Sequence, residues 1–168
     1  NQGCVVVGAT VWAVYAALLK EDKEQRFDLI LIDEASQMKV ADALIALATL
    51  GEQGHVILAG DDQQLPPIIQ GQYPDQHAHL LSSIFAYVRH QMEASAAQEP
   101  DIAARMLFQL EDNFRMNEPL TAYPRDILYG GRFFSQQPQS AMQLAAEPSS
   151  PLGAVFSQPA QPAVLCHY

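Results

Sequence analysis

Residues 27–37 read FDLILIDEASQ, an apolar run that ends abruptly in two carboxylates and a serine. Leucine and isoleucine fill residues 29–32 without polar alternation, which is typical of a strand buried on both faces of a parallel sheet. Parallel sheets bind ligands in the crevice at the carboxyl ends of their strands. We therefore expect Asp33 and Glu34 to lie at a ligand-binding edge.

An acidic pair at such an edge suits one kind of chemistry in particular. Asp33 can hold a hydrated Mg²⁺ that bridges nucleotide phosphates, while Glu34 orients or deprotonates the attacking water. This is the Walker B interpretation of the pair. The alternative is that both carboxylates merely cap the strand and open a polar loop, and the pair alone does not decide between the two.

A second polar loop reads GDDQQLPP over residues 60–67 and follows an apolar strand expected at residues 55–59. Residues 39–50 carry apolar side chains at helical spacing, so a strand, a helix and a parallel strand are predicted. A right-handed crossover would bring both strand ends to one crevice. Gln64 is long enough to reach a phosphate or a water there. The alternative is an ordinary loop without a binding role, since Gly-Asp and Pro-Pro are common in loops.

At these two loops the sequence resembles superfamily 1 helicases of the Upf-like type. Residues 33–37 look like motif II of that family and residues 60–67 look like motif III, in the same order and at matching spacing. A third segment, NFRMN at residues 113–117, is similar to the family's YRMH segment. The resemblance covers roughly residues 4–134, most of the chain.

The resemblance implies an α/β fold that is part of the three-layer parallel sheet of a RecA-like P-loop NTPase, with an irregular C-terminal extension. Residues 1–112 would form the C-terminal part of the first RecA-like domain, and residues 113–168 the seam and the start of the second. The implied cofactors are ATP and Mg²⁺. The implied partners are a DNA or RNA strand and the remaining helicase domains of the same protein.

The resemblance also implies a role for each matched residue. Asp33 would ligate Mg²⁺ and Glu34 would be the catalytic base. Gln64 would contact the γ-phosphate and couple its loss to strand movement, and Arg115 would stabilise the charge of the transition state. The alternative for Arg115 is a surface arginine that is paired with an acid nearby in the sequence: Glu111, Asp112 or Glu118.

Thr10 ends an apolar stretch at residues 4–10, which we expect to be a buried strand followed by a helix at residues 11–19. In the helicase family a threonine at this place looks like motif Ic, which contacts a nucleic-acid phosphate. Thr10 can equally N-cap the helix, and one residue can do both.

The later part of the chain is expected to hold a helix at residues 80–92, a strand at 104–110 and a short helix at 119–128. From Ser135 onward Gln, Pro, Ser and Ala dominate, so extended or partly disordered chain is expected. Two short apolar stretches, residues 154–156 and 163–165, are candidate edge strands of a second domain.

The composition of the 168 residues, 49% hydrophobic and 17% charged, is that of a globular protein. The net charge of −10 opposes nucleic-acid binding, because a basic face usually neutralises the phosphates. Either the acids lie away from the groove, or the basic contacts belong to other parts of the protein. Two cysteines without a signal peptide or long apolar span favour a reducing cytoplasm and no membrane contact.

The pattern Gly-x-x-x-x-Gly-Lys-Ser/Thr is missing from these residues, and with it the lysine and backbone nest that cradle ATP phosphates. Since the sequence also starts without Met, we expect an internal piece of a longer helicase that is inactive in isolation. Two other functional classes stay open: a nucleotide-driven ATPase that acts on protein, and a degenerate, non-catalytic interaction module.

Overall fold

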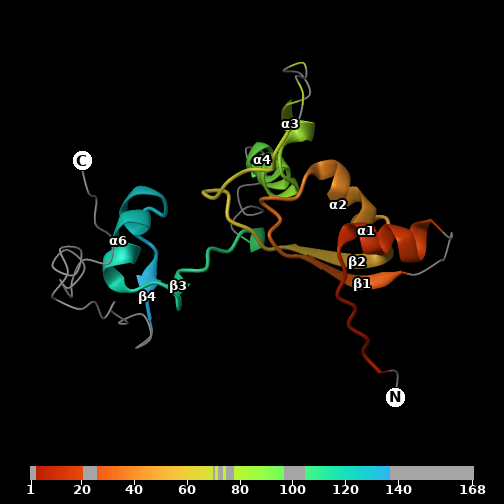
Figure 1. The fold of residues 1–168 in the computed structure, drawn as a ribbon, viewed down its shortest axis with the longest axis horizontal. Coiled ribbons are helices and arrows are strands. Elements are labelled where there is room, and N and C mark those ends of the chain that lie inside the picture. The colour runs from red at the N-terminus through yellow and green to blue at the C-terminus, as the bar shows by residue number, and fades with distance from the viewer. Residues whose placement is uncertain are drawn as a thin grey trace, which may run out of the picture. The chain divides into compact units, whose positions relative to one another are not determined.

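The computed structural model describes residues 3–20, 26–69, 71, 74, 78–96 and 105–136. The chain forms two compact units, Asn1–Met106 and Leu107–Tyr168 (Figure 1). The boundary expected between residues 112 and 113 concerns the domains of a longer helicase, and it stays a prediction.

Unit 1 is built on a pair of parallel strands, β1 (Phe27–Ile32) and β2 (Leu50–Leu58). Helix α2 (Val40–Leu47) connects them, so the predicted order of strand, helix and parallel strand is confirmed. Phe27 lies opposite Leu50, and after an irregularity the register is regular from Leu29 opposite His55 to Ile32 opposite Leu58. Strand β2 begins at Leu50, earlier than the expected residue 55.

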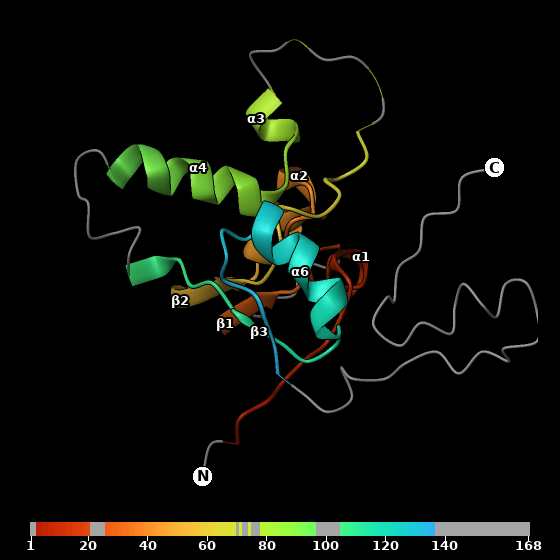
Figure 2. The same cartoon turned by 90° about the vertical axis from the view of Figure 1, so that its left-hand side faces the viewer.

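The core of unit 1 lies between one face of this sheet and two helices, α2 and α4 (Ile84–Ala96). Figure 2 shows α4 along its length, with the short helix α3 (Ala78–Leu81) beside its start. The buried apolar side chains of this core are Ile32, Ala35, Val40, Ala43 and Ile84. The chain therefore has the predicted α/β class, with helices and parallel strands.

Strand β1 is buried on one face only, so the expectation of burial on both faces is wrong for this structure. Leu29 and Leu31 are 54% and 60% exposed, and they alternate with the half-buried Ile30 and the buried Ile32. Adjacent side chains of a strand point to opposite faces. Among the described residues, no layer covers the face that carries Leu29 and Leu31.

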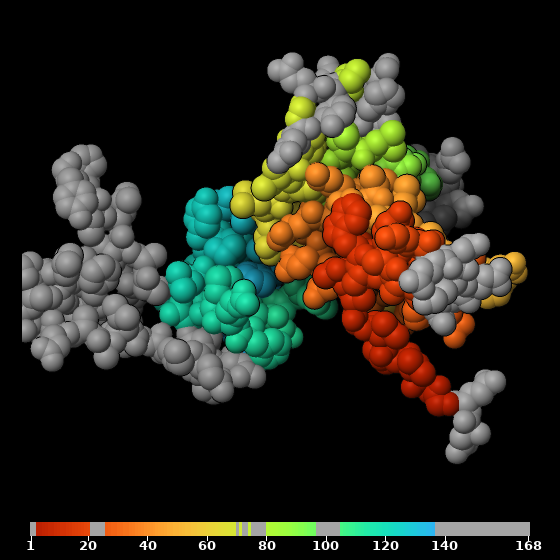
Figure 3. All heavy atoms as spheres, turned by 45° about the vertical axis from the view of Figure 1, so that its right-hand side comes forward, coloured from red at the N-terminus to blue at the C-terminus, as the bar shows by residue number. Residues whose placement is uncertain are grey.

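Residues 3–10 form an extended segment without strand pairing, so the buried strand expected at residues 4–10 is wrong. Val5, Val6 and Val7 are exposed, and Figure 3 shows the red segment projecting from the body of unit 1. A high β propensity makes a strand only where a partner supplies hydrogen bonds and burial. Instead of one α-helix there follow α1 (Val11–Val14) and a π-helical segment η1 (Tyr15–Leu19).

Unit 2 combines helix α6 (Glu118–Ile127) with a short parallel pair, β3 (Asp112–Asn113) and β4 (Phe134–Ser135). Helix α6 confirms the predicted short helix. The expectation of a strand at residues 104–110 is wrong. The pairing with β4 starts only at Asp112, and Leu110 is 88% exposed. The candidate strands at 154–156 and 163–165 lie outside the described residues.

Among the helices that the structure describes, none is both long enough and apolar enough to cross a membrane.

Candidate functional site

The ends of β1 and β2 stay joined beyond the regular ladder. The Ala59 N–H donates to the carbonyl oxygen of Ile32 at 2.9 Å, and the Ala35 N–H donates back to the carbonyl oxygen of Ala59 at 2.8 Å. Because the strands are parallel, the loop after β1 and the loop after β2 leave the sheet at the same edge. The prediction that both polar loops meet there is confirmed.

Gly60 is the point of closest approach between the two loops. A Cβ atom at this residue would lie 2.7 Å from the backbone nitrogen of Ser36 and 3.3 Å from Cδ2 of Phe85. The Asp61 N–H also donates to the Ser36 hydroxyl at 3.2 Å, and Ser36 is 3% exposed. Glycine is therefore required at this residue, because a Cβ atom would collide with the Ser36 backbone.

Glu34 sits in a strained turn directly after β1. Its φ of +52° lies in the left-handed region, which residues other than glycine, asparagine and aspartate rarely adopt. Its N–H donates to Oδ1 of Asp33 at 3.0 Å, and its Oε2 accepts a hydrogen bond from Nε2 of Gln37 at 3.4 Å. Backbone strain of this kind concentrates at functional sites, where the surrounding structure maintains it.

Asp33 suits a role as a single carboxylate ligand of Mg²⁺. The residue is exposed, and its Oδ2 accepts no hydrogen bond from the part of the chain that the structure describes. Mg²⁺ is usually held by one or two carboxylates, with water and phosphate oxygens completing its shell. Among the described residues, no three His, Cys, Asp or Glu side chains gather to hold a metal ion by themselves.

Gln64 is turned toward an acid of its own loop. Its Nε2 donates to Oδ2 of Asp61 at 2.9 Å, and the Gln63 N–H donates to Oδ1 of the same carboxylate at 3.1 Å. Gln64 is exposed, so its amide can turn outward without leaving a buried group unpaired. A contact with a nucleotide would require it to exchange Asp61 for the new partner.

Helix α4 binds the loop of Gln64 through a side-chain ion pair. Arg89 forms an ion pair and hydrogen bond with Asp62, and its Nε lies 3.2 Å from Oε1 of Glu93. On the same helix Phe85 donates its N–H to the carbonyl oxygen of Ala35 at 3.4 Å. Sequence reasoning missed Arg89, because it lies 27 residues from its partner and no local pattern links the two.

Arg115 is exposed, and it makes no ion pair with any residue that the structure describes. Two of the acids considered as its surface partners are engaged elsewhere, since Glu118 pairs with Arg125 and Oε1 of Glu111 lies 3.4 Å from Nη1 of Arg132. The alternative of a locally paired surface arginine is therefore not realised. Because Arg115 belongs to unit 2 and Glu34 to unit 1, their joint site stays a prediction.

Arg125, in the same unit, differs from Arg115 because it is paired with two acids, Glu118 and Asp126. Hydrogen bonds to Glu118 and then to Asp126 raise the pKa of Arg125 above its ordinary value. Its guanidinium therefore stays charged around neutral pH, and this group contributes no pH dependence to stability there.

Thr10 caps helix α1, since its Oγ1 accepts a hydrogen bond from the Ala13 N–H at 3.3 Å. The N-cap alternative is confirmed, and the phosphate contact stays a prediction.

The segment that contains these loops is similar to known proteins. A family model described as an AAA domain matches residues 2–72, which include β1, α2, β2 and the loop of Gln64. The human "Probable helicase with zinc finger domain" is 28% identical over 118 residues, which is 68% of this chain and 6% of that protein. The chain is a relative of the superfamily 1 helicases. The predicted resemblance is thus confirmed.

Two further relatives carry helicase names. "DNA replication ATP-dependent helicase/nuclease DNA2" of Xenopus laevis is 30% identical over 108 residues, covering 64% of this chain and 9% of that protein. "DNA polymerase alpha-associated DNA helicase A" of Saccharomyces cerevisiae is 29% identical over 122 residues, covering 71% and 16%. The chain therefore spans from 6% to 16% of the length of these three relatives.

Proposed function

We propose that this chain is part of the motor of an ATP-dependent superfamily 1 helicase, and that it works within a longer protein. The observation that carries the proposal is the shared sheet edge, where the Asp33–Glu34 turn and the loop of Gln64 are held together by hydrogen bonds. The β1-α2-β2 unit would be a piece of a three-layer RecA-like domain. In that domain, further elements would cover the exposed face of Leu29 and Leu31.

The chemistry assigned to this edge is the hydrolysis of ATP. Bound Mg²⁺ would neutralise negative charge on the phosphates, and Asp33 offers it the carboxylate oxygen Oδ2. Glu34 would accept the proton that the attacking water loses, with its carboxylate oriented by the hydrogen bond from Gln37. Arg115 would stabilise the charge that develops on the transferred phosphoryl group.

Gln64 would couple hydrolysis to movement along DNA or RNA. In the structure its amide donates a hydrogen bond to Asp61, and we propose that with ATP bound it turns to the γ-phosphate. Loss of that phosphate would return it to Asp61, so the loop has two alternative sets of contacts that a ligand can select.

The acidic balance of the chain affects where a nucleic acid can bind. A net charge of −10 opposes the binding of a strand to this segment unless its acids lie away from the groove. Basic contacts would come from the other domains of the longer protein. Thr10 remains a candidate phosphate contact in this chain.

The decisive test is Glu34→Gln in the longer protein that contains this chain. The amide keeps the shape of the side chain but cannot accept a proton, so we expect ATP turnover to fall by about 10²- to 10⁴-fold. Nucleotide affinity, measured by calorimetry, should stay unchanged. The matched control is Glu52→Gln on the exposed part of β2, which removes the same charge without affecting turnover.

The outcomes separate the functional classes. A near-normal rate in Glu34→Gln would exclude Glu34 as the base. Wild-type protein that hydrolyses ATP without stimulation by any nucleic-acid strand would indicate an ATPase that acts on another substrate. Absence of ATP binding in the intact protein would indicate a degenerate interaction module.

A further inference from the structure

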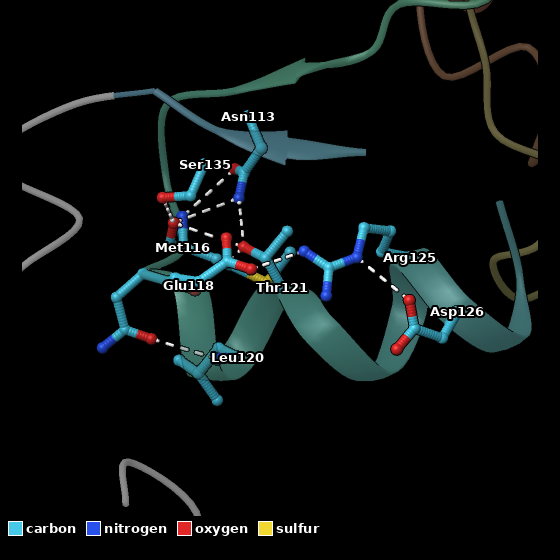
Figure 4. Close-up of polar contacts among 9 residues, drawn as sticks. Asn113, Met116, Glu118, Leu120, Thr121, Arg125, Asp126 and Ser135 are labelled. Atoms are coloured by element: carbon cyan, nitrogen blue, oxygen red, sulfur yellow. Dashed lines mark hydrogen bonds and ion pairs between the residues drawn. The ribbon is translucent and has the colours of Figure 1, made fainter. Parts of the chain in front are cut away.

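The loop that carries Arg115 is organised around one buried amide, that of Asn113 (Figure 4). Its Oδ1 accepts hydrogen bonds from the Arg115 N–H at 2.9 Å and the Met116 N–H at 3.1 Å. Its Nδ2 donates to the carbonyl oxygen of Met116 at 3.1 Å and to the hydroxyl of Thr121 at 2.9 Å. All four hydrogen-bonding positions of the amide are therefore in use.

Thr121 anchors this amide to helix α6. The residue is completely buried, and its hydroxyl accepts from Asn113 while donating to the carbonyl oxygen of Asn117 at 2.8 Å. A further hydrogen bond, from the Ser135 hydroxyl to the carbonyl oxygen of Met116 at 2.8 Å, joins β4 to the same loop. The backbone on either side of Arg115 is thus fixed to two elements of unit 2.

The link between Asn113 and Thr121 is not needed to form the helix itself. Helix α6 has its own cap, because Oδ1 of Asn117 accepts from the Leu120 N–H at 3.1 Å. The Thr121 N–H donates to the carbonyl oxygen of Asn117 at 2.9 Å, as in any first helical turn. The bond from Asn113 therefore serves the loop, and what the loop presents is the exposed side chain of Arg115.

We propose that Asn113 and Thr121 are positioning residues for Arg115, a role that rests on the function proposed above. A cation stabilises a transition state in proportion to its preorganisation, because it must be in place when the charge develops. Arg115 has a long side chain and no ion-pair partner among the described residues, so its backbone anchoring sets the point from which the guanidinium extends. The buried amide provides that anchoring.

The test is Thr121→Val in the longer protein, which removes the hydroxyl while keeping a branched side chain of similar shape. We expect the kcat for ATP to fall about tenfold, because small displacements of a catalytic group reduce rates by up to about 10²-fold. The KM for ATP and the affinity for a nucleic-acid strand should change by less than about twofold, since Arg115 acts in the transition state. Thr121→Ser keeps the hydroxyl, and we expect near-normal kcat.

A merely structural threonine would behave differently. Thr121→Val would then lower the melting temperature while the folded protein kept its kcat, and this result would overturn the proposal. Equal losses of kcat in Thr121→Val and Thr121→Ser would overturn it as well, because the hydroxyl would not be the group that matters. This threonine variant is preferred to Asn113→Ala, which leaves the partly buried backbone N–H groups of Arg115 and Met116 without their partner and threatens folding.

The second arm combines Thr121→Val with Arg115→Ala. We expect Arg115→Ala alone to reduce kcat by about 10³-fold or more. In that background, Thr121→Val should reduce kcat further by less than about twofold, since nothing is left to position. If the two effects multiply, Thr121 acts independently of Arg115 and the positioning role is wrong. A normal kcat in Arg115→Ala would refute the role assigned to Arg115 and the positioning role that rests on it, whereas the helicase proposal itself is decided by Glu34→Gln.

Discussion

The two candidate loops of this chain are held in place by different means. In unit 1 the Asp33–Glu34 turn is joined to the neighbouring loop mainly by backbone hydrogen bonds, and Gly60 allows the close approach. In unit 2 the loop of Arg115 is organised by a side chain, the buried amide of Asn113. Backbone bonds tolerate most changes of side chain, so unit 1 should be sensitive at the glycine and unit 2 at the amide.

The largest effect is expected for Gly60→Ala. The new Cβ would meet the Ser36 backbone nitrogen at 2.7 Å, and the turn must shift to accommodate it, which we expect to destabilise unit 1 by about 3 kcal/mol. Urea denaturation followed by circular dichroism measures this. The control is Gly8→Ala, where no atom lies within 4 Å of the new Cβ and the change should be below about 0.5 kcal/mol. Equal effects would show that the two loops are not closely packed.

Asn113→Ala should have the next largest effect. It leaves the N–H groups of Arg115 and Met116 without their partner, and we expect a loss of about 2 kcal/mol from the free energy of unfolding of unit 2. The control is Asn117→Ala, which removes only the helix cap and should cost about 1 kcal/mol. If the cap mutant were the more destabilised of the two, the amide would not be the organiser of this loop.

Glu34→Gly tests the strain in the turn of unit 1. Glycine adopts positive φ readily. We therefore expect the free energy of unfolding of Glu34→Gly to exceed that of Glu34→Ala by about 1 kcal/mol. Both variants lack the carboxylate, and both should lose ATP turnover, which makes Glu34→Ala the matched reference. A Glu34→Gly variant no more stable than Glu34→Ala would mean that the turn relaxes out of the left-handed conformation.

The smallest effect concerns the ion pair between Arg89 and Asp62. Both side chains are partly exposed, at 38% and 25%, so a double-mutant cycle with Arg89→Ala and Asp62→Ala should give a coupling energy of about 0.5 kcal/mol. The coupling should weaken at about 1 M salt, because screening acts on exposed charges. Glu93→Gln, which removes only the peripheral contact of Arg89, should leave the cycle unchanged. A coupling energy above about 2 kcal/mol at high salt would contradict this, because it would mean that the ion pair between Arg89 and Asp62 is shielded from solvent.

The features that could be predicted from the sequence are those that depend on neighbouring residues. The periodicity of residues 27–58 was sufficient to predict a strand, a helix and a parallel strand, because helical spacing and continuous apolar runs are properties of neighbouring residues. The acidic pair at the strand end and the short helix of residues 119–128 could be predicted for the same reason. Where a strand needed a distant partner, as for residues 4–10 and 104–110, propensity alone led to the wrong assignment.

The sequence by itself therefore determined the parallel pair of strands, the edge at which Asp33 and Glu34 lie, and the helicase family. Tertiary structure alone decided that Gly60 lies against Ser36, that Arg89 fastens the loop of Gln64, and that Asn113 bonds to Thr121. Each of these contacts depends on how separate segments pack together, and a side chain's hydrogen-bond partner is chosen by that packing. No spacing rule along the chain specifies it.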